Sequence, residues 1–324
     1  MDIYVKKAII HQFSPDDTDL YLADKLLNIT PKIEEYLRKK IERVYSDEAR
    51  TGIFEEDNPF LEMISDDLLE TSVAVANRWK EEFVVSENQK TNDLVFIQFS
   101  KEGVDHFAFL RIALRETLTH LGGEVDNPIK LTQNNLPGFG TGADEALVIN
   151  LQSRKYHLIE KRIKYNGTFL NYFSENLLQA QPKISPKKSI KALEKTAQKI
   201  AESFNTDDFQ FQSKVKSAIF NHIEEENKLS PEKLADDLFN DNLTARLSFI
   251  DQVKEAVPEP VTFEEIDASR QLKKFENQKL SLSNGIELIV PNNVYEDAES
   301  VEFILNENGT YSILIKNIED IQSK

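Results

Sequence analysis

A row of lysines in the middle of the chain is the strongest chemical signal in the sequence. Residues 186–204 are expected to form a helix, and at ~100° per residue four lysines fall within a stripe roughly 80° wide. These are Lys188, Lys191, Lys195 and Lys199, with Lys187 beside them in the first turn. The apolar residues of the segment gather on the opposite side. The helix would therefore dock by one face and present ammonium groups on the other.

The position of these lysines adds weight to a binding role. Lys187, Lys188 and Lys191 lie in the first two turns, where the helix dipole disfavours each cation by ~0.3–1 kcal/mol. A helix selected for stability alone would carry acids there. The competing interpretation is an ordinary solvated face, because runs of charge are usually surface.

A second basic group precedes the helix, on or beside an expected strand pair: Lys161, Arg162 and Lys164, preceded by Arg154 and Lys155. The stretch 154–199 holds eleven Lys and Arg against three acids, a net charge of +8. The whole chain carries −17, so the remainder carries −25. The basic stretch favours contact with the phosphates of double-stranded DNA, without reading of bases. The acidic remainder favours docking on a basic partner.

Catalytic signals are weak. The chain has no cysteine, which excludes thiol nucleophiles, thiolate metal sites and disulfides. The five histidines have no metal-ligand spacing, and the glycines of 138–142 lack the Lys and Ser/Thr of a phosphate-binding loop. The aromatic side chains of Phe169, Tyr172 and Phe173 are expected to fill a core-facing helix surface. We therefore expect no catalytic residue, no metal and no cofactor.

The length of 324 residues indicates about two domains' worth of chain. The N-terminus carries charge where a signal peptide would be apolar, and apolar runs are too short to cross a bilayer. A cytoplasmic protein with no membrane contact is expected.

The pattern of elements favours an α+β fold. We expect an α+β domain over 1–165, a helical region with the basic helix over 166–257, and a small antiparallel β region over 258–324. Strands are expected at 3–13, 94–100, 106–112, 146–151 and 156–163, and helices at about 31–44 and 68–84. Further helices are expected around 169–177, 186–204, 211–226, 231 onward and 247–257. The final strands are expected at 280–282, 286–290, 301–305 and 311–315.

Several short motifs together resemble the NdpA/YejK family of bacterial nucleoid-associated proteins. They are the opening strand Ala8-Ile9-Ile10-His11-Gln12-Phe13, the helix end Arg43-Val44-Tyr45-Ser46, the turn Gly52-Ile53-Phe54, and Tyr156 to Ile163 followed by Phe169-Leu170-Asn171-Tyr172-Phe173. The resemblance covers nearly the whole chain. It implies association with double-stranded DNA in the nucleoid, with little sequence preference, and contact with type II topoisomerases. It supplies no individual DNA-binding residues.

Three functions follow as alternatives. The first is a non-enzymatic DNA-binding protein that uses the 154–199 region. The second is an acidic interaction factor that docks on a basic partner such as a type II topoisomerase. The third is a hydrolase or nuclease, which requires Asp and Glu to converge with Lys in space. A homodimer through the central helices is also expected, from the aromatic residues Tyr165, Phe169, Tyr172, Phe173 and Phe204.

Overall fold

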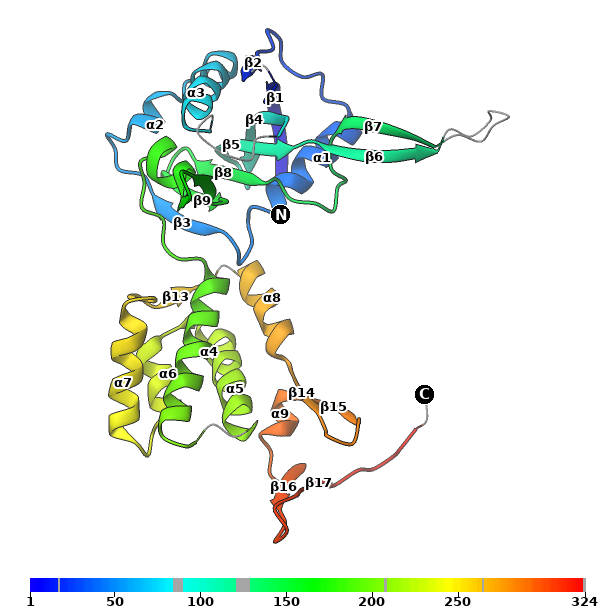
Figure 1. Ribbon diagram of the computed structural model, residues 1–324, viewed down its shortest axis with the longest axis vertical. Coiled ribbons are helices and arrows are strands. Elements are labelled where there is room, and N and C mark those ends of the chain that lie inside the picture. The colour runs from blue at the N-terminus through cyan, green and yellow to red at the C-terminus, as the bar shows by residue number, and fades with distance from the viewer. Residues whose placement is uncertain (17, 84–89, 121–128, 207–208, 264, 323–324) are drawn as a thin grey trace. The chain divides into compact units, whose positions relative to one another are not determined.

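The computed structural model describes residues 1–16, 18–83, 90–120, 129–206, 209–263 and 265–322. The chain forms two compact units, residues 1–185 and 186–324 (Figure 1), and each is described by itself. The three-part division at 165 and 257 stays a prediction.

Unit 1 is built on a seven-stranded antiparallel sheet in the order β2-β1-β4-β5-β8-β9-β3. The strands are β1 (Ile3–Ser14), β2 (Asp19–Tyr21), β3 (Arg50–Ile53), β4 (Asn92–Lys101), β5 (Val104–Ala113), β8 (Glu145–Asn150) and β9 (Lys155–Ile159). The helices of this unit are α1 (Pro31–Glu42), α2 (Pro59–Glu62), α3 (Leu68–Phe83) and the π-helical turn η1 (Phe173–Leu177).

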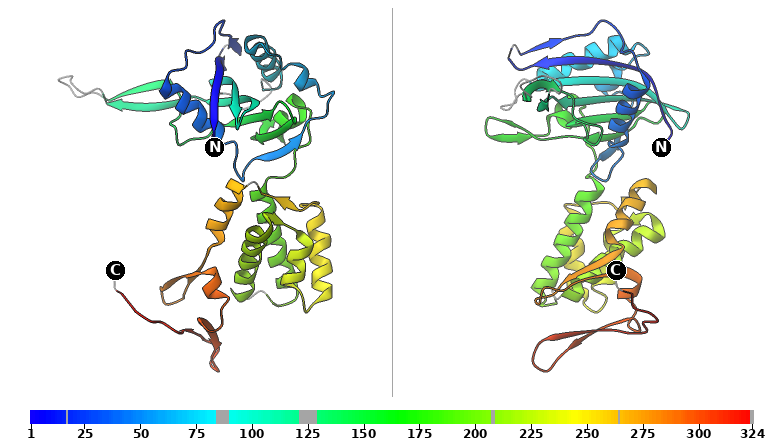
Figure 2. Two further views of the ribbon diagram at one scale, coloured as in Figure 1. Left: turned by 180° about the vertical axis from the view of Figure 1, so that it is seen from behind. Right: turned by 90° about the vertical axis from the view of Figure 1, so that its right-hand side faces the viewer.

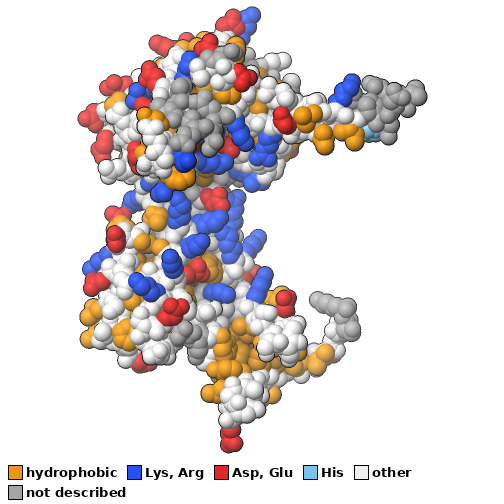
Figure 3. Space-filling model, in the orientation of Figure 1, with side chains coloured by type: hydrophobic (Ala, Val, Ile, Leu, Met, Phe, Trp, Pro, Cys, Tyr) orange, Lys and Arg blue, Asp and Glu red, His pale blue; other side chains and the backbone are white. Residues whose placement is uncertain are grey.

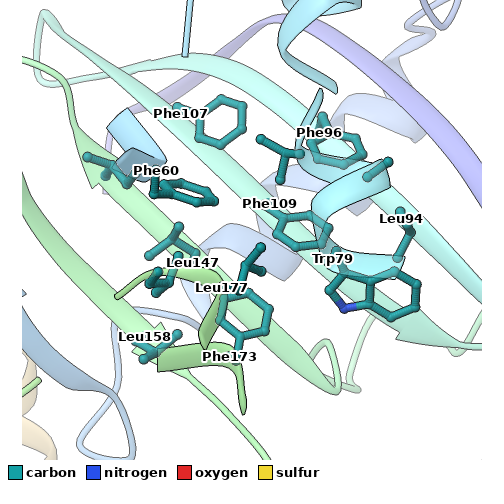
Figure 4. Close-up of a cluster of buried hydrophobic side chains, with 14 of the residues drawn as sticks. Phe60, Trp79, Leu94, Phe96, Phe107, Phe109, Leu147, Leu158, Phe173 and Leu177 are labelled. Atoms are coloured by element: carbon teal, nitrogen blue, oxygen red, sulfur yellow. The ribbon is translucent and has the colours of Figure 1, made fainter. Parts of the chain in front are cut away.

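The central strands of this sheet are buried on both faces. Successive side chains of a strand point to opposite sides, so alternate residues of β4 enter different cores. Leu94 and Phe96 join the cluster around Trp79 of α3 (Figure 4). Val95 and Ile97 join the cluster around the apolar face of α1. The sheet is therefore the middle of three layers.

The expected fold class is confirmed as α+β. The strand expected at 3–13, the hairpin formed by β4 and β5 around Gly103, and the helices α1 and α3 lie where the sequence placed them. Thr30 caps α1 by accepting a hydrogen bond from the Ile33 N–H. A second hairpin, β6 (Arg115–His120) with β7 (Ile129–Asn135), was not expected and projects from the sheet (Figure 2).

The helix expected around 169–177 was wrong in its first half. Residues Thr168–Leu170 form strand β11, which pairs with β10 (Ile163–Tyr165) across an Asn166-Gly167 turn with φ of 48° and 78°. Asn-Gly is a strong signal for a tight hairpin. The strand expected at 156–163 accordingly ends at Ile159 and resumes as β10. Phe169 is 60% exposed and is not a core residue, whereas Tyr172 and Phe173 are buried as expected.

Unit 2 is a helical bundle with small hairpins. Its elements are α4 (Pro186–Ser203), α5 (Phe209–Glu226), β12 (Lys228–Leu229), α6 (Pro231–Leu238), α7 (Leu243–Lys254), β13 (Val261–Thr262), α8 (Glu265–Phe275), β14 (Asn277–Ser281), β15 (Glu287–Pro291), α9 (Asn292–Tyr295), β16 (Val301–Leu305) and β17 (Tyr311–Ile315). A single apolar cluster joins α4 to α8. Helix α7 begins four residues before the expected start because Asn242 caps it. Helix α8 interrupts the region that was expected to hold strands alone.

The ring of Tyr156 explains why glycine stands first in the Gly52-Ile53-Phe54 motif. Gly52 on β3 lies opposite Tyr156 on β9, and a Cβ at position 52 would meet the Tyr156 hydroxyl oxygen at 2.3 Å. The Tyr156 ring is itself held against Phe54 at 4.4 Å between centroids. Only glycine leaves room for this buried tyrosine.

We therefore expect Gly52→Ala to lower the free energy of unfolding by about 1–3 kcal/mol, since it overpacks a filled core. Urea denaturation monitored by circular dichroism measures this. Gly138→Ala is the matched control, because a Cβ there meets nothing within 4 Å, and it should change stability by less than about 0.5 kcal/mol. Equal effects of the two variants would contradict the explanation.

A buried lysine organises the glycine-rich loop at 138–142. The Lys40 Nζ donates to the carbonyl oxygens of Pro137 at 3.2 Å, Gly138 at 2.9 Å and Thr141 at 2.5 Å. The loop thus turns carbonyls toward a cation, the opposite of a phosphate-binding loop, which offers N–H groups. Burial, and then repulsion from Arg43 and Arg115, lowers the pKa of Lys40 to about 8.

The Lys40 pKa in the folded state lies below the unfolded value near ~10.4. The folded state loses its proton first, so stability should rise by about 1–2 kcal/mol between about pH 8 and 9.5. Urea unfolding across this range tests it, and Lys40→Met should flatten the rise. The same rise in the Lys40→Met protein would show that another group titrates.

Candidate nucleic-acid interface

Helix α4 carries the lysine stripe as expected. Lys188, Lys191, Lys195 and Lys199 are exposed, and so is Lys187. The opposite side of the helix is buried, through Ser189, Ile190, Leu193, Ala197, Ile200 and Ala201. This apolar side packs against α5 and α7. The helix core thereby fixes the direction in which the ammonium groups point.

The lysines near the start of α4 are unfavourable for the stability of the helix. No acid lies in the first turn, so no carboxylate of that turn offsets the repulsion between its lysines and the positive end of the helix dipole. The helix contains two acids, Glu194 and Glu202. Burial raises the pKa of the half-buried Glu194, and Lys216 and Lys191 act in the opposite direction. Among the described residues, neither Lys188 nor Lys195 forms an ion pair, and Lys199 donates to the neutral amide of Gln252 at 3.0 Å. The stripe is thus largely free of acidic partners.

A second basic helix in unit 2 was missed from the sequence. Arg270, Lys273 and Lys274 of α8 are exposed, while Ala268 and Gln271 of the same helix are buried. Helices α4 and α8 both pack against α5. Lysine and arginine side chains gather on the face of unit 2 that carries α4 and α8 (Figure 3). The signal was present as Arg270-x-x-Lys273-Lys274, but the region had been expected to hold strands.

The lysines of α8 are less informative than those of α4. Lys273 and Lys274 lie in the last turn of α8, where the helix dipole favours cations. Helix stability alone therefore accounts for them. Their interest is that they widen a positive face already present on α4.

The other predicted basic residues belong to unit 1. Lys161 Nζ is 2.6 Å from Asp144 Oδ1, and Arg162 Nε donates to Asn171 Oδ1 at 3.4 Å. Lys164 is exposed on β10. Burial would raise the pKa of Asp144, but the hydrogen bonds from Lys161 and from the Ala113 N–H outweigh it, and the pKa is lowered. The carboxylate therefore stays charged and neutralises Lys161.

Beneath Lys161 lies a buried polar network that links β5, β8 and η1. The fully buried Glu145 accepts hydrogen bonds from Arg111 Nε at 2.6 Å and from the Tyr172 hydroxyl. Trp79 Nε1 donates to the Tyr172 oxygen at 3.0 Å, and Arg111 also donates to Asn92 Oδ1 at 2.8 Å. Burial and the nearby carboxylate raise the pKa of Tyr172 well above 10. The backbone N–H of Lys161 also lies 3.4 Å from Glu145 Oε1, so this network brings acids and a lysine together in unit 1.

The network does not resemble a hydrolytic site. Its carboxylates are already paired: Glu145 with Arg111 and the Tyr172 phenol, and Asp144 with Lys161. In the described parts of the chain, no group of three His, Asp or Glu side chains could hold a metal ion. The histidines serve separate contacts: His11 Nε2 lies 2.9 Å from the Ser72 hydroxyl, and His222 Nε2 lies 2.7 Å from Asp237.

Unit 1 also has a hollow in which polar side chains of the lining pair with one another. It is lined by Arg78, Glu82, Glu175, Asn176, Gln179, Ala180 and Gln181. Arg78 forms an ion pair with Glu82 at 2.9 Å, and the Asn176 amide donates to Glu82 at 2.8 Å.

None of the described helices is long and apolar enough to cross a membrane.

Comparison with known proteins agrees with the sequence resemblance. No curated protein matches the chain. A family match, described as nucleoid-associated protein YejK, extends over residues 9–321. Because this match covers nearly the whole sequence, the chain belongs to the YejK family of nucleoid-associated proteins.

Proposed function

We propose that this nucleoid-associated protein is a non-enzymatic, cytoplasmic protein that binds double-stranded DNA through phosphate contacts, with little sequence specificity. The observation that carries the proposal is the exposed lysine row of α4, placed against the helix dipole and backed by a buried apolar face. The residues assigned to DNA are Lys187, Lys188, Lys191, Lys195 and Lys199 on α4, with Lys161, Arg162 and Lys164 of unit 1.

The two groups are expected to contribute unequally. Lys161 is already neutralised by Asp144, so releasing it to a phosphate costs the existing ion pair. In the stripe of α4, Lys191 lies near Glu194 and Lys199 donates to Gln252, but among the described residues neither Lys188 nor Lys195 has an ion pair to lose. We therefore assign most of the phosphate contact to α4.

The first experiment is a gel shift with duplex DNA at low and moderate salt. Phosphate-driven binding is strongest at low salt, so retardation at ~50 mM and its loss on adding salt support the proposal. No retardation at ~50 mM salt would contradict it.

Reversing the four stripe lysines to Glu (Lys188, Lys191, Lys195, Lys199) should leave the fold intact and sharply reduce affinity on every DNA sequence. Their side chains point away from the core, so the stability change should be about 0.5 kcal/mol or less per site. If the stripe and Lys161, Arg162 and Lys164 each neutralise one phosphate, the slope of log K against log salt is about −6 per protomer. Four Lys→Gln changes in the stripe should bring it to about −3.

The matched control neutralises four exposed lysines of unit 2 outside the stripe: Lys228, Lys233, Lys254 and Lys279. This variant loses the same charge and should keep the slope of the unmodified protein. Circular dichroism verifies folding of each variant. If the slope falls equally in the two variants, net charge alone governs DNA binding. If the slope is unchanged in the stripe variant, the lysine stripe is only a solvated surface.

The contribution of α8 can be measured in the same assay. If α8 widens the face, Lys273→Gln with Lys274→Gln should reduce the magnitude of the slope by about 2. A slope unchanged within error would confine the contact to α4.

The acidic surface supports a second candidate function. The chain outside 154–199 carries −25, which favours docking on a basic partner such as a type II topoisomerase. Binding of the purified topoisomerase should weaken with salt and should survive reversal of the α4 stripe. If reversal of the stripe lysines abolishes topoisomerase binding, DNA and the topoisomerase would share the α4 face as their binding surface.

A further inference from the structure

Strand β17 of unit 2 has an unpaired outer edge in the part of the chain that the structure describes. In the described residues β17 pairs with β16 alone, and a two-stranded antiparallel sheet is marginally stable in water. Ring contacts hold the hairpin to α5: Phe209 lies 5.1 Å from Phe303 and 5.2 Å from Tyr311, between ring centroids. Among the described residues both long sides of this two-stranded sheet are therefore unpaired, and β16 carries the charged Glu302 whereas β17 carries no charged residue.

The hydrogen-bond pattern shows which backbone groups face outward. Asn306 N–H donates to Thr310 O at 2.8 Å, and Lys316 N–H donates to Ser300 O at 2.9 Å. Hydrogen-bonded and non-hydrogen-bonded pairs alternate along an antiparallel ladder. The even-numbered residues of 310–316 therefore bond toward β16, and Tyr311, Ile313 and Ile315 turn their N–H and C=O groups to the free edge.

The edge lacks the features that normally prevent pairing. Native edge strands are protected by charged side chains, proline or a bulge, and Tyr311–Ile315 contains no charge or proline and pairs in regular register. Tyr311 and Ile315 are 52% and 48% exposed, and the cross-strand neighbour of Tyr311, Leu305, is 63% exposed. Hydrophobic side chains gather in this part of unit 2 (Figure 3).

We propose that a second copy of this chain pairs antiparallel with β17, about a two-fold axis through Ile313. The two hairpins then form one four-stranded sheet. This register pairs the whole strand with itself: Ile313 lies opposite Ile313 of the second copy, and Tyr311 lies opposite Ile315. Every outward N–H and C=O of the strand then has a partner.

The charge distribution favours a second copy over a basic partner protein at this edge. All five cross-strand pairs are uncharged in the self-paired register, so no repulsion opposes it within the strand. The acids of the region, such as Asp297, Glu299 and Glu307, lie outside β17, and the nearby Lys316 is already 2.7 Å from Glu302. A basic partner would be drawn to those flanks, but it would find no charge on the strand itself.

This dimer contact differs from the one expected at the central aromatic residues. Of those, Tyr172 and Phe173 are buried in the core of unit 1 and are unavailable to a second chain, whereas Tyr165 and Phe169 are exposed.

The register can be tested with two double variants of the full chain at the same two exposed positions. Tyr311→Lys with Ile315→Lys places lysine opposite lysine twice in the proposed dimer. Tyr311→Lys with Ile315→Glu places lysine opposite glutamate twice. Within one hairpin these positions are on the same strand and are not opposite each other, and both variants lose the Phe209 contact equally.

Light scattering and sedimentation over a range of micromolar concentrations should show a dimer for the unmodified protein. The Lys/Lys variant should be monomeric, and the Lys/Glu variant should dimerise at least about tenfold more tightly than the Lys/Lys variant, because directly opposed charges on neighbouring strands interact. Added salt should strengthen the unmodified dimer, since it screens repulsion between the acidic flanks. Circular dichroism and urea midpoints confirm that both variants fold.

Three results would overturn the proposal. A monomeric unmodified protein excludes the dimer. A Lys/Lys variant that stays dimeric places the contact elsewhere, for example on the central helices, and equal loss in both variants excludes this register. DNA affinity of the monomeric variant is a separate readout, so failure here leaves the assignment of the α4 stripe to DNA untouched.

Discussion

Burial of β4, β5 and β8 on both faces is the constraint on which unit 1 depends. An antiparallel sheet commonly leaves one face in water, but here α1 covers one side and α3 with η1 covers the other. Arg111 and Glu145 lie on these central strands, so they must pair with each other and with Tyr172 inside the protein. Breaking such a pair on one side leaves an uncompensated buried charge, which is costly. The covered sheet therefore holds a structural network rather than a solvent-facing site.

Burial and bonding partners also distinguish the roles of the lysines in the chain. Lys40 is buried and saturated by three carbonyl oxygens, so it stabilises a loop. Lys161 is exposed but held by Asp144. The lysines of α4 lie on an exposed face opposite a full apolar stripe, and the helix dipole opposes several of them. Local stability explains the first two cases and fails to explain the third, which is why α4 carries the functional proposal.

Sequence patterns predicted elements well where one local rule dominated. The apolar stripe of α4, the Ser230-Pro231 start of α6 and the Asn306 to Gly309 turn are each set by residues within a few positions. The α+β class followed from these elements. Two local signals were overlooked: the Asn166-Gly167 turn, which makes Phe169 a strand residue, and the Asn242 cap of α7.

Long-range relations could not be obtained from one sequence. The ion pair between Lys161 and Asp144 joins the segment between β9 and β10 to the residue just before β8, and nothing in the spacing distinguishes Lys161 from the lysines of α4. The same holds for the common packing of α4 and α8 on α5, which sets two basic helices in one unit. The space around Gly52 is likewise filled by Tyr156, more than a hundred positions away in the chain.

The lysine face of α4 and the edge of β17 lie in the same unit, so the proposed dimer would affect the proposed DNA binding. Non-specific binding through phosphates is weak at physiological salt, with Kd of roughly 10⁻⁴–10⁻⁶ M, and the acidic remainder of this chain opposes it further. Pairing through β17 would join two copies of the α4 face without depending on how units 1 and 2 are arranged. The second face would then bind as a tethered group at a high effective concentration, which raises affinity with no new contact. An acidic chain can in this way hold DNA through a small basic surface, provided that the surface is presented twice.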